Sequence, residues 1–123
     1  NTASPLSKVD DIKRVFQAFE KTDSLSVISV NSRAVHAVCA ENPVNFCYED
    51  SAFARTQDLH PILLYNYSLM GWKFEAINDL RKGILFGNDV LMVETSILSS
   101  FLLKTESDYK FLLSLREAIE KKE

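Results

Sequence analysis

The chain contains few of the residues that build turn-rich or cross-linked folds. Its 123 residues include only three glycines, three prolines and two cysteines. So few turn-forming residues disfavour a sandwich or barrel that needs many tight turns. Two cysteines cannot form a disulfide framework, and so low a count is typical of a reducing compartment. We therefore expect an intracellular protein, in the cytoplasm or nucleus, in which Cys39 and Cys47 are reduced.

Long apolar runs and an excess of positive charge are also missing. No apolar run reaches the roughly 18 residues of a membrane-spanning helix, and no signal-peptide pattern is present. We therefore expect no membrane partner. The net charge is −3, whereas a nucleic-acid-binding protein usually carries a basic excess that displaces the counterions of phosphate. Nucleic acid is therefore a disfavoured partner, although the charge does not exclude it.

Two patterns favour secretion instead. A turn-forming segment, residues 41–44, lies between the two cysteines and could place them face to face as a hairpin disulfide. Asn66-Tyr67-Ser68 matches the acceptor sequence for N-glycosylation. That acceptor, however, lies inside the apolar segment 62–70, where a glycan would prevent burial. The intracellular interpretation is therefore preferred.

Size and composition predict one folded domain. The chain is 46% hydrophobic and 25% charged, which is ordinary for a globular protein long enough to bury a core. We expect residues 1–7 to be a flexible lead-in and residues 8–123 to form a single globular domain. The sequence does not begin with methionine, which indicates either a fragment of a larger protein or a processed start, and we expect the fragment.

The first third of the chain predicts a helix and short strands. Residues 8–21 have the period of an amphipathic helix with Ser7 as its N-cap, and its apolar face should point to the core. Residues 25–30 are rich in β-branched side chains and predict a strand, with a turn at Asn31-Ser32. Residues 33–40 fit either a second strand or a short helix, and residues 45–48 fit a brief third strand.

The remainder of the chain predicts helices. Pro61 suits the first turn of a helix, and helical periodicity continues over residues 72–86, 90–104 and 107–122. The predicted fold class is α+β: an N-terminal helix, a short β-hairpin or three-stranded meander, and then a helix-rich C-terminal half. The residues expected to form the core between the N-terminal and C-terminal helices are Phe16, Ile77, Leu80, Phe101 and Leu112.

Recognisable chemistry is scarce. The soft metal ligands His36, Cys39, Cys47 and His60 fall in one region, but only His36 and Cys39 have the spacing of a structural zinc pair. The apolar surroundings of both cysteines should keep their thiols protonated and unreactive. We therefore expect no catalytic residue, no metal site and no cofactor. Enzymatic activity is left undecided, with its absence favoured.

The leading functional hypothesis is a non-enzymatic protein–protein interaction or dimerisation domain with a regulatory role in a larger protein. Its partner would be another protein or a second copy, because the apolar stripes of the predicted C-terminal helices are wide for so small a domain. The residues expected at the interface are Trp72, Tyr109, Leu115 and Ile119.

Two alternatives belong to other functional classes. The first is a nucleic-acid-binding, winged-helix-like domain whose helix 72–86 presents Lys73, Arg81 and Lys82. The second is a small ligand-binding or enzymatic α+β fold. Its pocket would be lined by Tyr65, Tyr67, Trp72 and Glu94.

Overall fold

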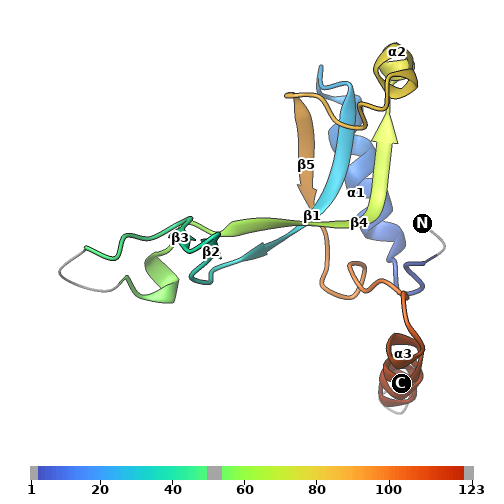
Figure 1. The fold of residues 1–123 in the computed structure, drawn as a ribbon. Helices are drawn as coiled ribbons and strands as arrows, with labels where there is room; N and C mark the ends of the chain where they lie inside the picture. Colours follow the sequence, from blue (N-terminus) through green and yellow to red (C-terminus); the bar gives the residue numbers. More distant parts are fainter. Residues whose placement is uncertain (1–2, 50–53, 121–123) are drawn as a thin grey trace.

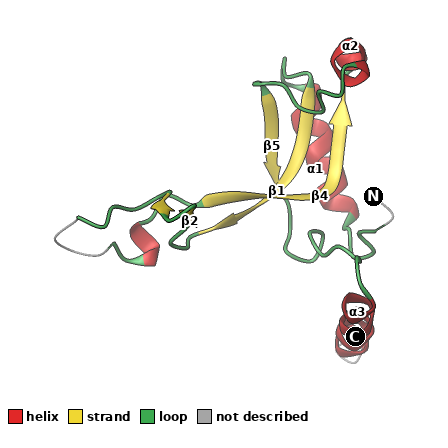
Figure 2. Cartoon of the chain, viewed as in Figure 1, coloured by secondary structure: helices red, strands yellow, loops and turns green. Residues whose placement is uncertain are grey.

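The computed structural model describes residues 3–49 and 54–120 and has a mixed α+β fold (Figures 1 and 2). Its elements, in chain order, are α1 (Val9–Glu20), β1 (Ser26–Arg33), β2 (Val38–Cys39), β3 (Asn42–Pro43), the 3-10 helix η1 (Thr56–Asp58), β4 (Ile62–Trp72), the 3-10 helix η2 (Phe74–Ala76), α2 (Ile77–Arg81), β5 (Val90–Glu94) and α3 (Glu106–Glu120). The predicted α+β class is thereby confirmed, whereas the predicted helix-rich C-terminal half is not.

A three-stranded sheet organises the molecule, and β1 is its central strand. β4 pairs with β1 antiparallel and β5 pairs with it parallel. The first six residues of β1, 26–31, are all buried. Val27, Ile28 and Val30 suit this position because β-branched side chains pack well on a pleated surface that is covered on both sides.

α1 covers one face of the sheet (Figure 1). The approach is close at Gly71 of β4, where an added Cβ would lie 3.1 Å from Val27 Cγ1 and 3.6 Å from the Phe19 ring. The helix confirms the prediction for residues 8–21, but its N-cap is Lys8 rather than Ser7. The buried hydroxyl oxygen of Ser7 has no hydrogen-bond partner among the described residues.

The outer halves of β1 and β4 leave the sheet as a two-stranded arm (Figure 1). The arm carries the small hairpin of β2 and β3, whose turn residues Ala40 and Glu41 both have positive φ. β1 therefore continues through the turn predicted at Asn31-Ser32. Arg33 is the last residue of β1, and residues 34–40 form neither the predicted strand nor the predicted helix, apart from the two residues of β2. No strand forms over 45–48.

Three predicted helices are largely absent. The segment after Pro61 is an eleven-residue strand, β4, and of the predicted helix 72–86 only the five residues of α2 are α-helical. The predicted helix 90–104 is absent, because Val90–Glu94 forms β5 and residues 95–104 form turns and irregular structure. These segments contain short apolar runs, and a short apolar run is compatible with a buried strand as well as with a helix. The helix predicted over 107–122 is confirmed by α3 as far as residue 120, and residues 121 and 122 lie outside the described residues.

The core differs from the predicted one. Its buried apolar side chains lie on β1, α1 and η2, with one more between η1 and β4, and they are Val15, Val27, Ile28, Val30, Leu59 and Ala76. Phe16 is 61% exposed, so its prediction as a core residue is wrong. Ile77, Leu80, Phe101 and Leu112 are only partly buried. The helices expected to enclose these residues do not form or, like α3, do not pack on the sheet.

Candidate functional site

The interior of the described chain is unusually polar. Six of the described apolar residues are buried, whereas ten polar or charged ones are. Hydrogen bonds between side chains therefore contribute much of the packing in the interior. The polar set is Ser4, Asp11, Ser24, Ser26, Ser29, Asn31, Asn66, Ser68, Thr95 and Ser99. Burying so many polar groups is tolerable only when they are paired, because an unpaired one costs free energy.

The first polar cluster fills a bulge in β4. Pairing with β1 is interrupted between Ile28 and Val30, where four residues of β4 lie opposite the single residue Ser29. Tyr67, inside the bulge, has a φ of 55°. The Ser29 hydroxyl donates to Asn66 Oδ1 at 2.5 Å and accepts the Leu69 N–H at 3.0 Å. A side chain of β1 thus replaces ladder hydrogen bonds that the bulge removes.

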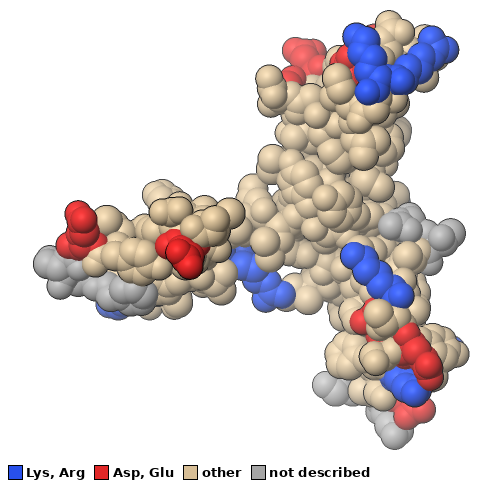
Figure 3. Space-filling model, viewed as in Figure 1, with Lys and Arg blue, Asp and Glu red and all other residues tan. Residues whose placement is uncertain are grey.

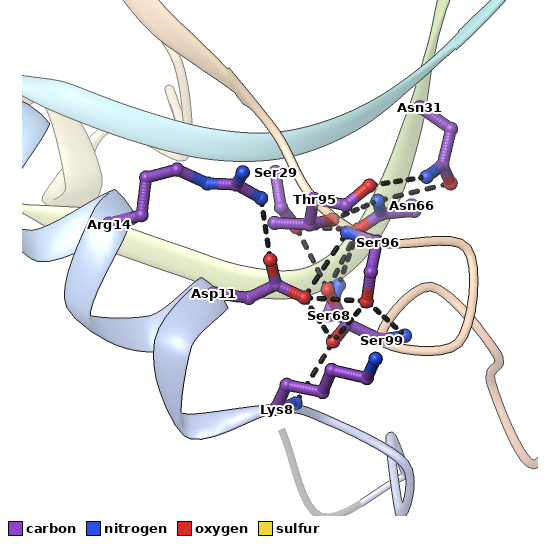
Figure 4. Close-up of polar contacts among 10 residues, drawn as sticks. All are labelled: Lys8, Asp11, Arg14, Ser29, Asn31, Asn66, Ser68, Thr95, Ser96 and Ser99. Atoms are coloured by element: carbon purple, nitrogen blue, oxygen red, sulfur yellow. Dashed lines mark hydrogen bonds and ion pairs between the residues drawn. The ribbon is translucent and has the colours of Figure 1, made fainter.

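Asn66 connects this cluster to the neighbouring strands. Its Nδ2 donates to Asn31 Oδ1 on β1 at 3.2 Å and to Thr95 Oγ1, just beyond β5, at 3.0 Å. Asn31 in turn donates to the Thr95 carbonyl at 3.1 Å (Figure 4). Asn66 is buried, so a glycan on its nitrogen would break a network that spans all three strands.

The second polar cluster surrounds Asp11 on α1. Oδ2 of this carboxylate accepts hydrogen bonds from the Ser96 N–H, the Ser96 hydroxyl and the Ser99 hydroxyl, and Oδ1 accepts one from Arg14 at 2.5 Å (Figure 4). Ser99 Oγ also accepts the Lys8 N–H at 3.0 Å. The cluster ties the first turn of α1 to the segment that follows β5.

The electrostatics of Asp11 follow from this geometry. Burial by itself raises the pKa of the carboxyl group. The hydrogen bonds from Ser96 and Ser99, together with the positive charge of Arg14, outweigh burial and hold the pKa of Asp11 below its ordinary value. Asp11 is therefore a fixed anion that accepts hydrogen bonds, which is the opposite of a poised general acid.

Neither cluster has the layout of a catalytic site. A serine nucleophile needs an adjacent base. His36 lies between β1 and β2 and His60 between η1 and β4, whereas the hydrogen-bond partners of Ser99 are Asp11, Ser96 and Lys8. His36 Nε2 is 2.8 Å from the Ala54 carbonyl oxygen and its ring meets Phe46 edge-on, while His60 is exposed. Within residues 3–49 and 54–120, no three metal-ligating side chains gather at one point.

The cysteines are placed differently from the prediction. Cys39 and Cys47 are free thiols, but both are exposed rather than packed among apolar residues. Among the described helices, none is long and apolar enough to cross a membrane.

The most unusual surface is the outer side of α1. The helix turns Val15 and Asp11 inward and leaves Val9, Ile12 and Phe16 exposed by 63%, 45% and 61%. We call these three residues the α1 stripe. The amphipathic pattern predicts that they face the core, but they face solvent, because the sheet accepts the neighbouring helix face that carries Asp11.

A shallow groove borders the α1 stripe. It has a volume of about 160 Å³ and runs between α1 and the edge strand β4. Its walls are apolar and consist of Ile12, Val15, Phe16, Phe19, Val27, Leu69, Met70 and Gly71. Apolar side chains on both an exposed helix and a sheet edge are the features that accept an amphipathic helix from elsewhere.

A second apolar surface covers the sheet face opposite α1. Tyr65, Trp72 and Phe86 gather there, with the Trp72 and Phe86 rings stacked at 5.9 Å and Tyr65 meeting Phe86 edge-on at 6.1 Å. Trp72 is partly buried, and its indole N–H donates to the Leu85 carbonyl. Figure 3 shows this face as largely uncharged, with charged side chains gathered over α2, α3 and the arm.

The proposed ligand-pocket residues are only partly brought together. Tyr65 and Tyr67 meet edge-on at 6.0 Å, and Glu94 lies two strands away from Tyr65, with Val30 paired between them. Trp72 lines a cleft of about 230 Å³ beside Asp79 and Asp89, and the two tyrosines and Glu94 do not line it. This volume is below the roughly 300–1,000 Å³ of typical ligand pockets.

α3 carries the remaining predicted interface residues. Tyr109 is 50% exposed and Leu115 is partly buried, whereas the side chain of Ile119 lies outside the described residues. In the described part of the chain, α3 has no substantial packing contact with another helix or strand, and Figure 1 shows it apart from the sheet. Phe111 rests on Phe101 of the segment that leads into the helix. Trp72 is the last residue of β4, which has no substantial contact with α3 in the described part of the chain, so Trp72 does not share a patch with Tyr109 and Leu115.

Sequence reasoning missed the α1 stripe as a surface and both polar clusters. One signal was available for the clusters. Ser29 and Asn31 alternate in β1, and Asn66 and Ser68 alternate in β4, which is the period of one strand face. No such signal was available for the α1 stripe, because the helical period of α1 is the same whether its apolar face packs on the sheet or faces solvent.

Comparison with protein-family models finds no match to this chain, and comparison with curated proteins finds none either.

Proposed function

We propose that this chain is a non-enzymatic protein-interaction domain that self-associates. The observation that supports the proposal most directly is the α1 stripe. An amphipathic helix normally gains stability by burying its apolar side, and here Val15 is buried while the three residues of the stripe are exposed. A partner that covered the stripe would recover the free energy of burial that the isolated chain leaves unused.

The total surface area supports the same proposal. The chain exposes 9079 Å² of accessible surface, whereas a compact monomer of its 14.0 kDa mass exposes about 6,700 Å². The excess is about three times the roughly 800 Å² that each partner hides in a standard protein–protein interface. The arm and the separate α3 account for the extended shape (Figure 2). Both are available to make contacts with another molecule.

The two alternatives have less support. A nucleic-acid-binding helix over 72–86 would need its full length, but α2 has five residues, and Lys73 is engaged with the Thr22 carbonyl oxygen and the Phe19 ring. A ligand pocket at Trp72 would need more volume than the cleft provides. An intracellular location and a regulatory role in a larger protein belong to the proposal, as does a single globular domain over residues 8–123.

Sedimentation velocity and light scattering over a concentration series test the proposal. We expect a species of twice the 14.0 kDa chain mass that dissociates on dilution. Phe16→Asp should shift the midpoint to higher concentration, because it places a charge on the exposed stripe. Gln17→Asp, which adds the same charge beside the stripe, is the matched control. A chain that stays monomeric up to about 1 mM would contradict self-association.

A further inference from the structure

Two helices of this chain carry apolar stripes with the same spacing. Val9, Ile12 and Phe16 on α1 are three and then four residues apart, and so are Leu112, Leu115 and Ile119 on α3. This alternation is the seam of paired helices, in which side chains of one helix fit between those of the other. The stripes are also similar in length, at about 11 Å each from first to last residue.

Each stripe lacks a helix partner within the described chain. The α1 stripe borders the groove beside β4, whose apolar walls could seat a further helix. α3 stands apart from the sheet and from α1 (Figure 1). One chain therefore contains both halves of a helix pair but does not bring them together.

Local contacts at the base of α3 hold it away from the α1 stripe of its own chain. The Leu103 N–H donates to the Ala3 carbonyl at 2.8 Å, which fixes the chain three residues before Glu106, the first residue of α3. Asp108 accepts hydrogen bonds from the N–H groups of Lys104 and Thr105, and its own N–H donates to Thr105 Oγ1. These bonds form a capping box that sets the direction of the helix from its first turn.

We propose that the α1 stripe and the adjoining groove bind α3 of a second copy, and that the two copies exchange α3 reciprocally. This inference rests on the proposed self-association and names the surfaces that carry it. Reciprocal exchange about a twofold axis pairs α1 with α3 in both copies and covers the exposed α1 stripe of each. The excess accessible surface is large enough, because obligate homodimers hide about 2,000–5,000 Å² in total.

Disulfide trapping between two different single-cysteine proteins tests the exchange. Both full-length proteins carry Cys39→Ser and Cys47→Ser, which remove exposed thiols of the arm. One protein also carries Phe16→Cys and the other Leu115→Cys. After mixing and mild oxidation, we expect the mixed α1–α3 disulfide to dominate over both homodimeric disulfides. The matched control replaces Phe16→Cys by Gln17→Cys, which should cross-link at least about 10-fold less because position 17 lies off the stripe.

The outcomes separate this inference from the proposed function. A dimer in solution whose cross-links join α1 to α1, or α3 to α3, would overturn the exchange while leaving self-association intact. An internal disulfide in the double variant Phe16→Cys/Leu115→Cys, with a monomeric mass, would show α3 closing on its own chain and would also overturn it. A monomer with no cross-link of either kind would refute both proposals. Circular dichroism of each variant confirms that the fold is unchanged.

Discussion

Asp11 and Ser96 lie 85 positions apart in the sequence and are joined by two hydrogen bonds, from the Ser96 N–H at 3.1 Å and from the Ser96 hydroxyl at 2.6 Å. A carboxylate that accepts a backbone N–H and a hydroxyl from one residue acts as a side-chain cap for the turn that begins there. The turn continues to Ser99, which donates to the same oxygen. The start of α1 and the segment after β5 are therefore fixed to each other through one ionised group.

Replacing Asp11 by Asn should destabilise the fold by about 2–3 kcal/mol at neutral pH. The substitution keeps the shape but removes the charge, and hydrogen bonds to charged groups are the stronger ones. Chemical denaturation gives the free energy of unfolding. The control Asp10→Asn, at an exposed position of the same turn, should change it by no more than about 0.5 kcal/mol. Equal effects at both positions would contradict the role assigned to Asp11.

Stability should fall with acidity in a window set by Asp11. The folded state lowers the pKa of this carboxyl, so the unfolded chain takes up a proton first as the pH falls below the ordinary aspartate value of about 3.9. The stabilisation is complete above that pH and is lost as the pH falls through the lowered, folded-state pKa. Denaturant midpoints from pH 7 to pH 2 should therefore decline less steeply in Asp11→Asn than in the parent.

Removing the Ser29 hydroxyl should cost about 1–3 kcal/mol. Ser29→Ala leaves the Leu69 N–H without its acceptor and Asn66 Oδ1 without its shortest donor in a fully buried region. Ser32→Ala, further along the same strand in the partly exposed arm, is the matched control. Hydrogen exchange of the Leu69 amide should rise in Ser29→Ala, and unaltered exchange there would argue against the bulge being held by this side chain.

Truncating Ile28 and truncating Phe16 should have opposite consequences. Ile28 is fully buried, so Ile28→Ala should lower the free energy of unfolding by about 2–5 kcal/mol. Phe16→Ala should change the unfolding of the monomer by less than about 1 kcal/mol and should instead weaken association. Thermal melts at a concentration below the dimer midpoint, paired with light scattering above it, separate the two effects.

α3 should unwind independently of the sheet. Asp108→Ala removes the acceptor for the N–H groups of Lys104 and Thr105, and no large packing contact compensates for the loss of this cap. Hydrogen exchange should accelerate through the first turn of α3 and stay unchanged in β1. Acceleration in both elements would show that the helix and the sheet unfold as one unit.

Local pattern was sufficient to predict α1 and α3 because each has a long, single period with charged residues between the apolar ones. It failed for β4 and β5, since a short apolar segment has the same composition in a covered strand as in a helix. Pairing decides between the two, and β5 pairs with a strand more than 60 positions earlier in the chain. No signal within Val90–Glu94 carries that information.

The exposure of Phe16 could not be predicted for a related reason. The helical period places Phe16 on the apolar face with Val15. How the helix is turned against the sheet depends on which residues donate hydrogen bonds to Asp11. Ser96 and Ser99 lie in a turn that the sequence predicts as helix. The interface prediction at Tyr109, Leu115 and Ile119 depends only on the period of α3, and it remains a prediction.

The position of β5 determines the order in which the chain can fold as it is made. β1 and its buried polar residues are synthesised early. The polar clusters around Asn66 and Asp11 gain their last hydrogen-bond partners only after Thr95, Ser96 and Ser99 have been synthesised. Distant pairings of this kind form slowly, because a long loop must close before any contact stabilises it. A nascent chain that ends before residue 90 therefore presents an unfinished sheet edge and an α1 whose Asp11 lacks its partners Ser96 and Ser99. Chaperones on the ribosome recognise apolar segments that are exposed in this way.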